Sequence, residues 1–357
     1  KSLGEELENL GRLHSDKNNS IIQELWLLGR YHGQYHWSDG SGGSEEGYED
    51  RRFRIGAQAK LFNHLTLHAQ MVSGSDFEPF YNGFTELWAS WQFSEAVNLT
   101  VGQQKHRFTF DRNVSSRYIT TMERSLLTNQ FGLDYTPAVT LSGKIGSFSY
   151  YTGVFSNATG TDMEEAFTEL NSGWSYIATG IFDLGESLNT DTAHVHLSYI
   201  HSEANANANL MNRFDNGAAA ALILTEGPAA LVAEVTGGMG GARGSAYGIN
   251  IQPSYFITDN LQIVARYQLA FADQANGLRA QRRYERNVGL GAGDLYQAGY
   301  VGLNYHVAKH RLKFMTGLEY SSLGGRDQWT AWTGVRLFWG PHSKGPFPMA
   351  QMLPGAW

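Results

Sequence analysis

The chain contains 357 residues, no cysteine, 27 Lys and Arg, 34 Asp and Glu, and a mean hydropathy of -0.35. No run of about eighteen apolar residues occurs, which excludes a bundle of transmembrane helices, and the lack of cysteine excludes a disulfide scaffold. The formal net charge of -7 disfavours a nucleic-acid-binding protein, and no linker divides the chain into two domains.

The first twenty residues differ from the rest. Leu3, Leu7 and Leu10 recur at helical spacing among acidic residues, which indicates a short amphipathic helix. The alternative is a loosely ordered leader. We expect residues 1–20 to precede the folded body, and the absence of an apolar signal region at Lys1 indicates a processed form of a secreted chain.

From residue 21 onward, apolar and polar residues alternate for about ten residues and then give way to a turn. In the stretch 261–271, Leu, Ile, Ala, Tyr, Leu and Phe fall on one face, while Gln, Arg and Gln fall on the other. This is a β-strand between two different environments. Sixteen such segments are predicted: 22–37, 51–61, 64–73, 84–93, 97–106, 129–136, 145–156, 174–183, 192–202, 216–225, 229–238, 246–256, 261–272, 296–307, 311–321 and 328–339.

Long and short connections alternate between these segments. The long ones cover 38–50, 74–83, 107–128, 157–173, 202–215 and 273–295. Outer-membrane barrels have an even number of strands, brief periplasmic turns and long extracellular loops. The sequence therefore predicts an all-β protein, a transmembrane antiparallel β-barrel of about 16 strands over 21–339, with residues 1–20 in the periplasm.

Four prolines lie in the tail 340–357, so this segment cannot form another strand. Either the tail hangs in the periplasm or it folds against the mouth of the pore.

The connection 107–128 is the first candidate for a functional site. It carries four arginines and follows a lysine, while only Asp111 and Glu123 oppose them. A long loop in this position can fold inward and narrow the lumen, where guanidinium groups attract anions. The alternative is that these residues pair with acids of the wall and pin the loop. The predicted anion pathway consists of Lys105, Arg107, Arg112, Arg117 and Arg124.

A second basic group follows the barrel wall. Arg52, Arg54 and Lys60 share one face of the second strand, and this polar face is predicted to look inward. By the same rule Arg266 and Lys313 face the lumen. A basic ladder would pass an anion from site to site, but charge on a porin wall also serves simply to keep it wet.

Other clusters point less clearly to a role. Arg279, Arg282, Arg283 and Arg286 either draw anions to the mouth or bind lipopolysaccharide phosphates. The histidine pairs His194/His196 and His32/His36 are more typical of polar lumen fillers than of metal ligands. No catalytic trio is apparent, so we expect neither an enzyme nor a cofactor.

Several segments together resemble the phosphate-selective porin O and P family. The resemblance implies a sixteen-stranded trimeric porin with an arginine-lined passage. Two features depart from the family pattern: Gln103 and Arg107 replace an Arg and a Pro, and residues continue beyond Trp339. The segments that carry the resemblance are Arg51-Arg52-Phe53-Arg54-Ile55-Gly56, Val101-Gly102-Gln103-Gln104-Lys105-His106-Arg107-Phe108 and, most specifically, Met122-Glu123-Arg124-Ser125-Leu126.

The sequence thus predicts an outer-membrane porin of a Gram-negative-type bacterium, which passes small hydrophilic solutes with a leaning toward phosphate-like anions. The expected partners are outer-membrane lipid, lipopolysaccharide, permeating anions, two further copies in a homotrimer, and a periplasmic or envelope protein at the termini. The alternative function is a structural barrel that anchors or sheathes another envelope component through those termini.

Overall fold

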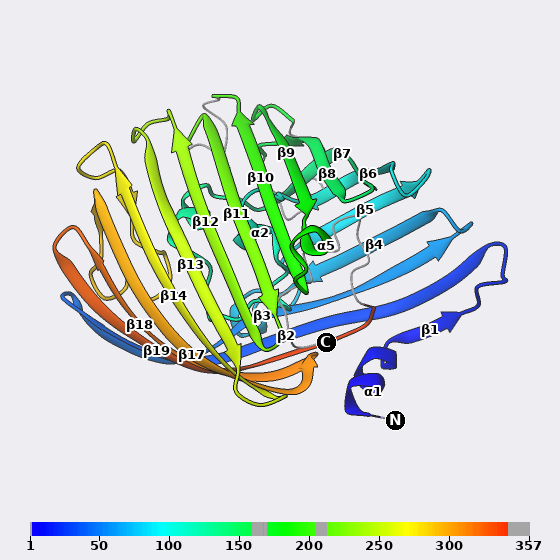
Figure 1. Cartoon of the computed structure of the whole chain (residues 1–357), viewed down its shortest axis with the longest axis horizontal. Helices are drawn as coiled ribbons and strands as arrows, with labels where there is room; N and C mark the ends of the chain where they lie inside the picture. Colours follow the sequence, from blue (N-terminus) through cyan, green and yellow to red (C-terminus); the bar gives the residue numbers. More distant parts are fainter. Residues whose placement is uncertain (1, 159–166, 168–169, 205–212, 342–357) are drawn as a thin grey trace.

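The computed structural model describes residues 2–158, 167, 170–204 and 213–341. Within these residues, sixteen antiparallel strands form one closed ring, because β19 pairs with β2 and β9 pairs with β10 (Figure 1). The predicted barrel is confirmed. The ring consists of β2 (Ile22–Gly40), β3 (Gly43–Leu61), β4 (Leu65–Val72), β5 (Phe84–Gln92), β6 (Asn98–Lys105), β7 (Tyr135–Ile145), β8 (Phe148–Ser156), β9 (Trp174–Asp183), β10 (Thr192–Ser202), β11 (Asn216–Glu226), β12 (Ala229–Met239), β13 (Ala246–Phe256), β14 (Leu261–Ala272), β17 (Leu295–His310), β18 (Leu312–Leu323) and β19 (Arg326–Trp339).

Short elements lie outside the ring. β1 (Arg12–Ser15) pairs with β2, and β15 pairs with β16 within one long connection. These elements are α1 (Leu3–Asn9), a 3-10 turn η1 (Ser75–Phe77), α2 (Phe110–Asn113), α3 (Leu126–Gln130), α5 (Gly185–Leu188), β15 (Leu278–Arg279) and β16 (Ala292–Gly293). Among the described residues, no helix is long and apolar enough to cross a membrane.

The alternation of side chains has the polarity of a membrane barrel. On β14 the outward residues Ile263, Tyr267 and Phe271 are 38%, 43% and 49% exposed, while the inward Gln262 and Arg266 are buried. Apolar groups outside and polar groups inside are stable only where the outer surface meets lipid. The period-2 pattern therefore produces both the strands and the membrane-facing surface.

Two predicted boundaries were wrong. The first long connection, 38–50, is strand, since β2 and β3 continue to a turn at residues 41–42. The acidic run that suggests a loop is accommodated by cross-strand hydrogen bonds, with Tyr35 donating to Glu46 at 2.9 Å and Gln34 donating to Glu49 at 3.0 Å.

The seventh strand was also misplaced. It covers Tyr135–Ile145 and not 129–136, because residues 126–130 form α3, whose Leu126 and Leu127 are buried inside the barrel. The connection between β6 and β7 consequently covers residues 106–134. We call this segment loop three.

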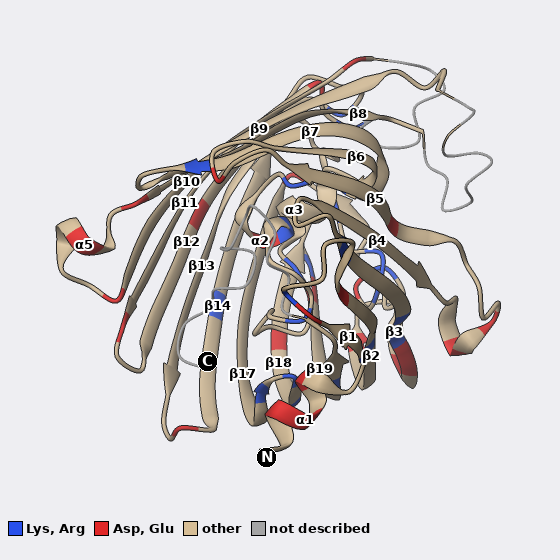
Figure 2. Ribbon diagram, turned by 90° about the vertical axis from the view of Figure 1, so that its right-hand side faces the viewer, with Lys and Arg blue, Asp and Glu red and all other residues tan. Residues whose placement is uncertain are grey.

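The N-terminal segment lies at the periplasmic end of the barrel. Ser2 caps α1, which contacts β17 and β19, and the Glu8 carboxylate lies 3.8 Å from the Arg311 guanidinium (Figure 2). The described start of the tail is close by, since Arg311 donates to the Gly340 carbonyl at 2.9 Å.

Candidate functional site

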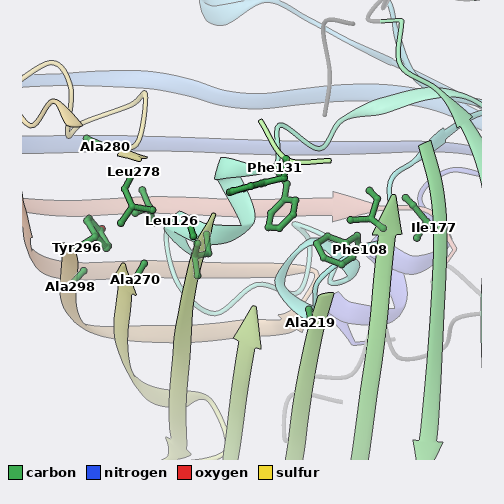
Figure 3. Packing of buried hydrophobic residues seen from close by; sticks show 14 of the residues in the cluster. Phe108, Leu126, Phe131, Ile177, Ala219, Ala270, Leu278, Ala280, Tyr296 and Ala298 are labelled. Carbon is green, nitrogen blue, oxygen red and sulfur yellow. The ribbon is translucent and has the colours of Figure 1, made fainter. Parts of the chain in front are cut away.

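Loop three lies inside the barrel and packs against part of its inner wall (Figure 2). Phe108, Leu126 and Phe131 project from the loop onto inward-facing residues of the wall, among them Ile177 and Ala219 (Figure 3). Burial of these side chains holds the loop on the inner face of β9–β14 and β17–β19. We call this the covered half of the barrel.

Polar contacts fix the same loop to the covered half. Arg266 donates to the Glu123 carbonyl at 2.6 Å and pairs with Glu319 at 2.9 Å. The Lys313 ammonium donates to the Ile119 carbonyl at 2.6 Å. Each bond satisfies a loop carbonyl that water does not reach, so both cations serve to position loop three.

A passage remains between loop three and the opposite wall, formed mainly by β2–β7, which we call the open half. Its cavity has a volume of about 1330 Å³. Among the described residues, its lining includes sixteen Lys and Arg against eight Asp and Glu, although acids outnumber bases in the whole chain. The passage therefore concentrates positive charge in a protein of net negative charge.

Three guanidinium groups converge where strands β2 and β3 of the wall meet loop three. Arg30 and Arg54 are direct cross-strand partners on β2 and β3. Arg30 donates to Ser116 of loop three at 2.6 Å, and Arg54 donates to the Tyr135 hydroxyl at 2.9 Å. Arg112 lies over the Tyr135 ring at 5.3 Å, beside Arg54 at 5.2 Å from the same ring.

These guanidinium groups keep unused donors. Arg30 is 4% exposed and Arg54 is 9% exposed, yet the Nε of each has no hydrogen-bond partner among the described residues, and neither do Nε and Nη2 of Arg112. No described carboxylate lies within 4.0 Å of Arg30 or Arg54, whereas Nη2 of Arg112 lies 3.9 Å from Oδ1 of Asp134. Like charges directly opposite on neighbouring strands are destabilising, so this pairing is an arrangement suited to a negative ligand.

The other predicted loop residues also border the passage, with different contacts. The Arg107 guanidinium lies 5.8 Å from the Tyr151 ring. Arg117 donates to the Pro341 carbonyl at 3.3 Å and lies over Phe338 at 5.3 Å. Arg107 is thus held by an aromatic face, whereas Arg117 joins loop three to the end of the last strand.

Lys105 and Arg124 line the passage and pin the loop at the same time. Lys105 donates to the Val114 carbonyl at 3.1 Å, and Arg124 donates to the Asp111 and Val114 carbonyls at 2.8 and 2.9 Å. Burial, followed by the neighbouring Arg112, lowers the pKa of Arg124 to about 10. Arg124 therefore remains a cation at neutral pH.

One ion pair crosses the passage. Arg51 on β3 binds both carboxylate oxygens of Glu123, at 2.7 and 2.9 Å. Burial alone would raise the pKa of Glu123, but the Arg51 guanidinium holds it well below its usual range. Glu123 is consequently charged and neutralises Arg51, which leaves the remaining arginines in excess.

The structure brings together eight of the ten predicted residues along the passage. Arg52, Arg54 and Lys60 line its open half, together with the five residues of the predicted anion pathway. Arg266 and Lys313 face the barrel interior as expected, but loop three covers them and they do not border the passage.

The long connection 273–294 folds over the extracellular end of the passage. Asn129 of loop three donates to Gln281 at 2.7 Å, and Arg283 pairs with Glu49 at 2.5 Å. Arg282, Arg283 and Arg286 therefore border the mouth, whereas Arg279 bonds to Gln130 through its backbone. This position fits attraction of anions, and contact with lipopolysaccharide stays a prediction.

Histidine pairs provide no metal centre among the described residues, which contain no group of three or more His, Cys, Asp or Glu that could hold a metal ion. His194 instead lies 3.2 Å from Asp183, and His196 packs edge-on against Phe110 of loop three.

Sequence reasoning missed two residues that lie at this cluster of guanidinium groups, Arg30 and Tyr135. Arg30 has the same parity as inward Gln34 and His32, so its orientation was readable, but nothing local reveals that it opposes Arg54. Tyr135 was missed because the seventh strand was placed too early.

Comparisons with known proteins agree with the barrel fold. No curated protein matches the chain. Three solved structures share the fold at low identity: OprB of Pseudomonas putida (12% identity, 88% of this chain and 94% of that chain, TM-score 0.64), an anion-selective porin from Comamonas acidovorans (11%, 88% and 99%, 0.63), and OmpF of Salmonella typhi in complex with daunomycin (12%, 91% and 100%, 0.62).

A family model described as phosphate-selective porin O and P matches residues 28–328. This match covers the ring from β2 into β19 and includes Arg30, Arg54, Arg112 and Tyr135. The chain belongs to the phosphate-selective porin O and P family, and it is a channel that crosses the outer membrane as a multi-pass β-barrel.

Proposed function

We propose that the protein is a passive diffusion channel for small hydrophilic solutes that prefers anions, and that selection occurs where Arg30, Arg54 and Arg112 meet. The observation that carries this proposal is the cross-strand pair Arg30 and Arg54, which faces the passage without a described carboxylate within 4.0 Å. Fixed guanidinium groups in a poorly hydrated passage attract anions and offer directed donors to oxyanions.

The remaining basic residues extend the selection along the passage. Arg282, Arg283 and Arg286 supply positive charge at the extracellular mouth, Arg107 and Arg112 at the loop, and Lys60 toward the periplasmic end. An anion moves between such sites because each binds it weakly. Phosphate and other oxyanions of similar size are the favoured permeants, since a guanidinium matches two oxygens at once.

Bilayer recording in a potassium chloride gradient tests the proposal. The wild-type channel is expected to give a reversal potential of the sign that marks chloride preference, and Arg54→Gln is expected to reduce it. Lys309→Gln is the matched control, because it removes one positive charge from an exposed periplasmic turn. Cation preference in the wild type, or equal effects of the two variants, would contradict the proposal.

We further propose that three copies assemble in the membrane. Strands β4, β5 and β6 contain only 8, 9 and 8 residues, which is at or below the length that spans a bilayer, so a neighbouring subunit would shield this low wall. The mass of the unheated, detergent-solubilised complex distinguishes a trimer from a monomer. The structural alternative, an anchor that acts through its termini, requires a purified barrel without ion conductance.

A further inference from the structure

The open half carries apolar surface at positions where a water-filled wall needs none. On β5 the inward-facing residues are Glu86, Trp88 and Ser90, and Trp88 borders the passage. Inward positions of a porin wall are typically polar. An indole that faces a wet lumen leaves apolar area in water unless something covers it.

Trp88 belongs to a row of side chains that crosses four strands. Trp26 pairs with Gln58, Gln58 with His68, and His68 with Trp88, so neighbouring members are one strand apart. The His68 ring stacks on the Trp88 ring with centroids 4.8 Å apart and planes 6° from parallel, and a 3.2 Å hydrogen bond joins His68 to Gln58. All four border the passage. We call this row the aromatic ledge.

The ledge lies on the periplasmic side of the constriction. Along β3, Gln58 follows Arg54 by four residues toward the periplasmic turn, which corresponds to roughly 13 Å of strand. On β5, Trp88 follows Glu86 by two residues, roughly 7 Å. A solute that leaves the guanidinium groups in this direction meets the aromatic ledge, with Lys60 two residues beyond Gln58 on β3 and the Arg12 guanidinium 5.8 Å from the centre of the Trp26 ring.

Glu86 lies between the guanidinium groups and the aromatic ledge, and its charge favours one orientation of the solute. Its carboxylate lies 4.0 Å from the His68 ring, at the border between the guanidinium groups and the ledge. A second negative charge on the solute would lie close to this carboxylate and be repelled. The arrangement therefore suits a solute with one anionic end and one uncharged, planar end.

We propose that the passage recognises organic monoanions with a planar apolar body, in particular aromatic carboxylates. Arg30, Arg54 and Arg112 hold the carboxylate, Arg30 and Arg54 through Nε donors that have no hydrogen-bond partner among the described residues, and the aromatic ledge carries the ring. Offset stacking of rings adds to the guanidinium contact, so such a solute binds more tightly than a small anion of the same charge. This inference rests on the proposed anion channel and adds planar organic monoanions to the small oxyanions as a second class of substrate.

Block of the chloride current tests the inference, with sodium benzoate and sodium acetate as probes of equal charge. In the wild type, benzoate is expected to reach half-block at a concentration at least tenfold lower than acetate. Trp88→Ala is expected to raise the half-blocking concentration of benzoate about twofold to tenfold, the range that an aromatic contact supplies, and to leave acetate unchanged.

The matched control is Trp91→Ala, which removes an indole from the outward face of the same strand. If Trp88→Ala does not fold, Trp88→Leu keeps an apolar side chain without a planar face and is expected to lose most of the benzoate preference. Equal block by benzoate and acetate in a chloride-selective wild type would overturn this inference alone. So would equal effects of the Trp88 and Trp91 variants. A cation-selective wild type would overturn the proposed function as well.

Discussion

The two halves of the barrel both turn apolar side chains outward, but their inward-facing side chains differ: they are largely apolar on β11 of the covered half and largely basic on β3 of the open half. In the covered half, β11 turns Ala219, Ala221 and Ile223 inward, where loop three buries them. In the open half, β3 turns Arg54 and Lys60 into the passage. One side of the interior is therefore packed like a protein core, and the other is a wet, cationic wall.

The difference shows how a wide barrel becomes a narrow channel. Loop three uses apolar contact with one half to present its arginines to the other half. Because the covered half excludes water, its few charges are hydrogen-bonded or paired: Arg266 and Lys313 donate to loop carbonyls, and Glu234 accepts from the Phe110 N–H of the loop. Charges of the open half remain available to a solute.

Breaking the covered half should have the largest effect. Glu319→Ala leaves Arg266 as a buried cation without its carboxylate, which costs on the order of 3–5 kcal/mol and loosens the loop segment that Arg266 holds. The expected result is a lower temperature of barrel unfolding and a larger single-channel conductance. Thermal unfolding in detergent and bilayer recording measure the two effects.

The control is Glu186→Ala, which removes a carboxylate from the exposed helix α5. If Glu319→Ala leaves both the unfolding temperature and the conductance at wild-type values, loop three does not depend on this contact.

Two lysine variants, one in each half of the barrel, should have effects of intermediate size. Lys313→Met removes the donor to the Ile119 carbonyl, and should cost about 1.5–3 kcal/mol of stability with little change in reversal potential. Lys60→Met should reduce chloride preference with little change in stability, because Lys60 borders the passage. The unfolding temperature and the reversal potential are measured on both variants. A change in reversal potential in Lys313→Met together with a loss of stability in Lys60→Met would contradict the assigned roles.

The smallest expected effect concerns pH at the boundary of the two halves. Glu285 in the connection 273–294 accepts hydrogen bonds from the Tyr296 hydroxyl at 2.7 Å and from the backbone N–H of Gln281 at 2.6 Å. Burial, followed by the charge of nearby Glu319, raises the pKa of Glu285 from 4.5 to about 7. Since the folded protein binds this proton more tightly than the unfolded chain, the contribution to stability is complete below about pH 4.5 and is lost as the pH rises through 7.

The unfolding temperature of the wild type should therefore fall between pH 5 and pH 8, and Glu285→Gln should flatten that slope. Glu186→Gln serves as the exposed control. A slope that persists in Glu285→Gln would assign the pH dependence to other carboxyl groups.

Much of the fold was predictable from local patterns. Strands such as β9, β10, β13 and β14 match their predicted ranges, because alternation with a period of two is written in consecutive residues. The errors fall where two signals compete. Acidic residues near 45–50 resemble a loop but continue a strand, and residues 129–130, predicted to begin a strand, belong to a helix inside the lumen.

One strand of the covered half has a sequence pattern that differs from the usual alternation. Residues 218–224 are apolar on both faces, which is typical of a strand buried on both sides. In a barrel this means that lipid covers one face and protein covers the other. This apolar pattern identifies a strand that is covered on its inner face, but it does not identify the segment that covers it.

The amino-acid sequence by itself determined the strands, which of their side chains face lipid and which face the lumen, and the basic character of loop three. Each of these depends on residues that are neighbours in the chain. Only the tertiary structure decided that Arg30 opposes Arg54, that Tyr135 lies between two guanidinium groups, and that Arg266 and Lys313 are covered. Those relations depend on the register of the closed ring and on where loop three packs within it, and both join residues that are far apart in the chain.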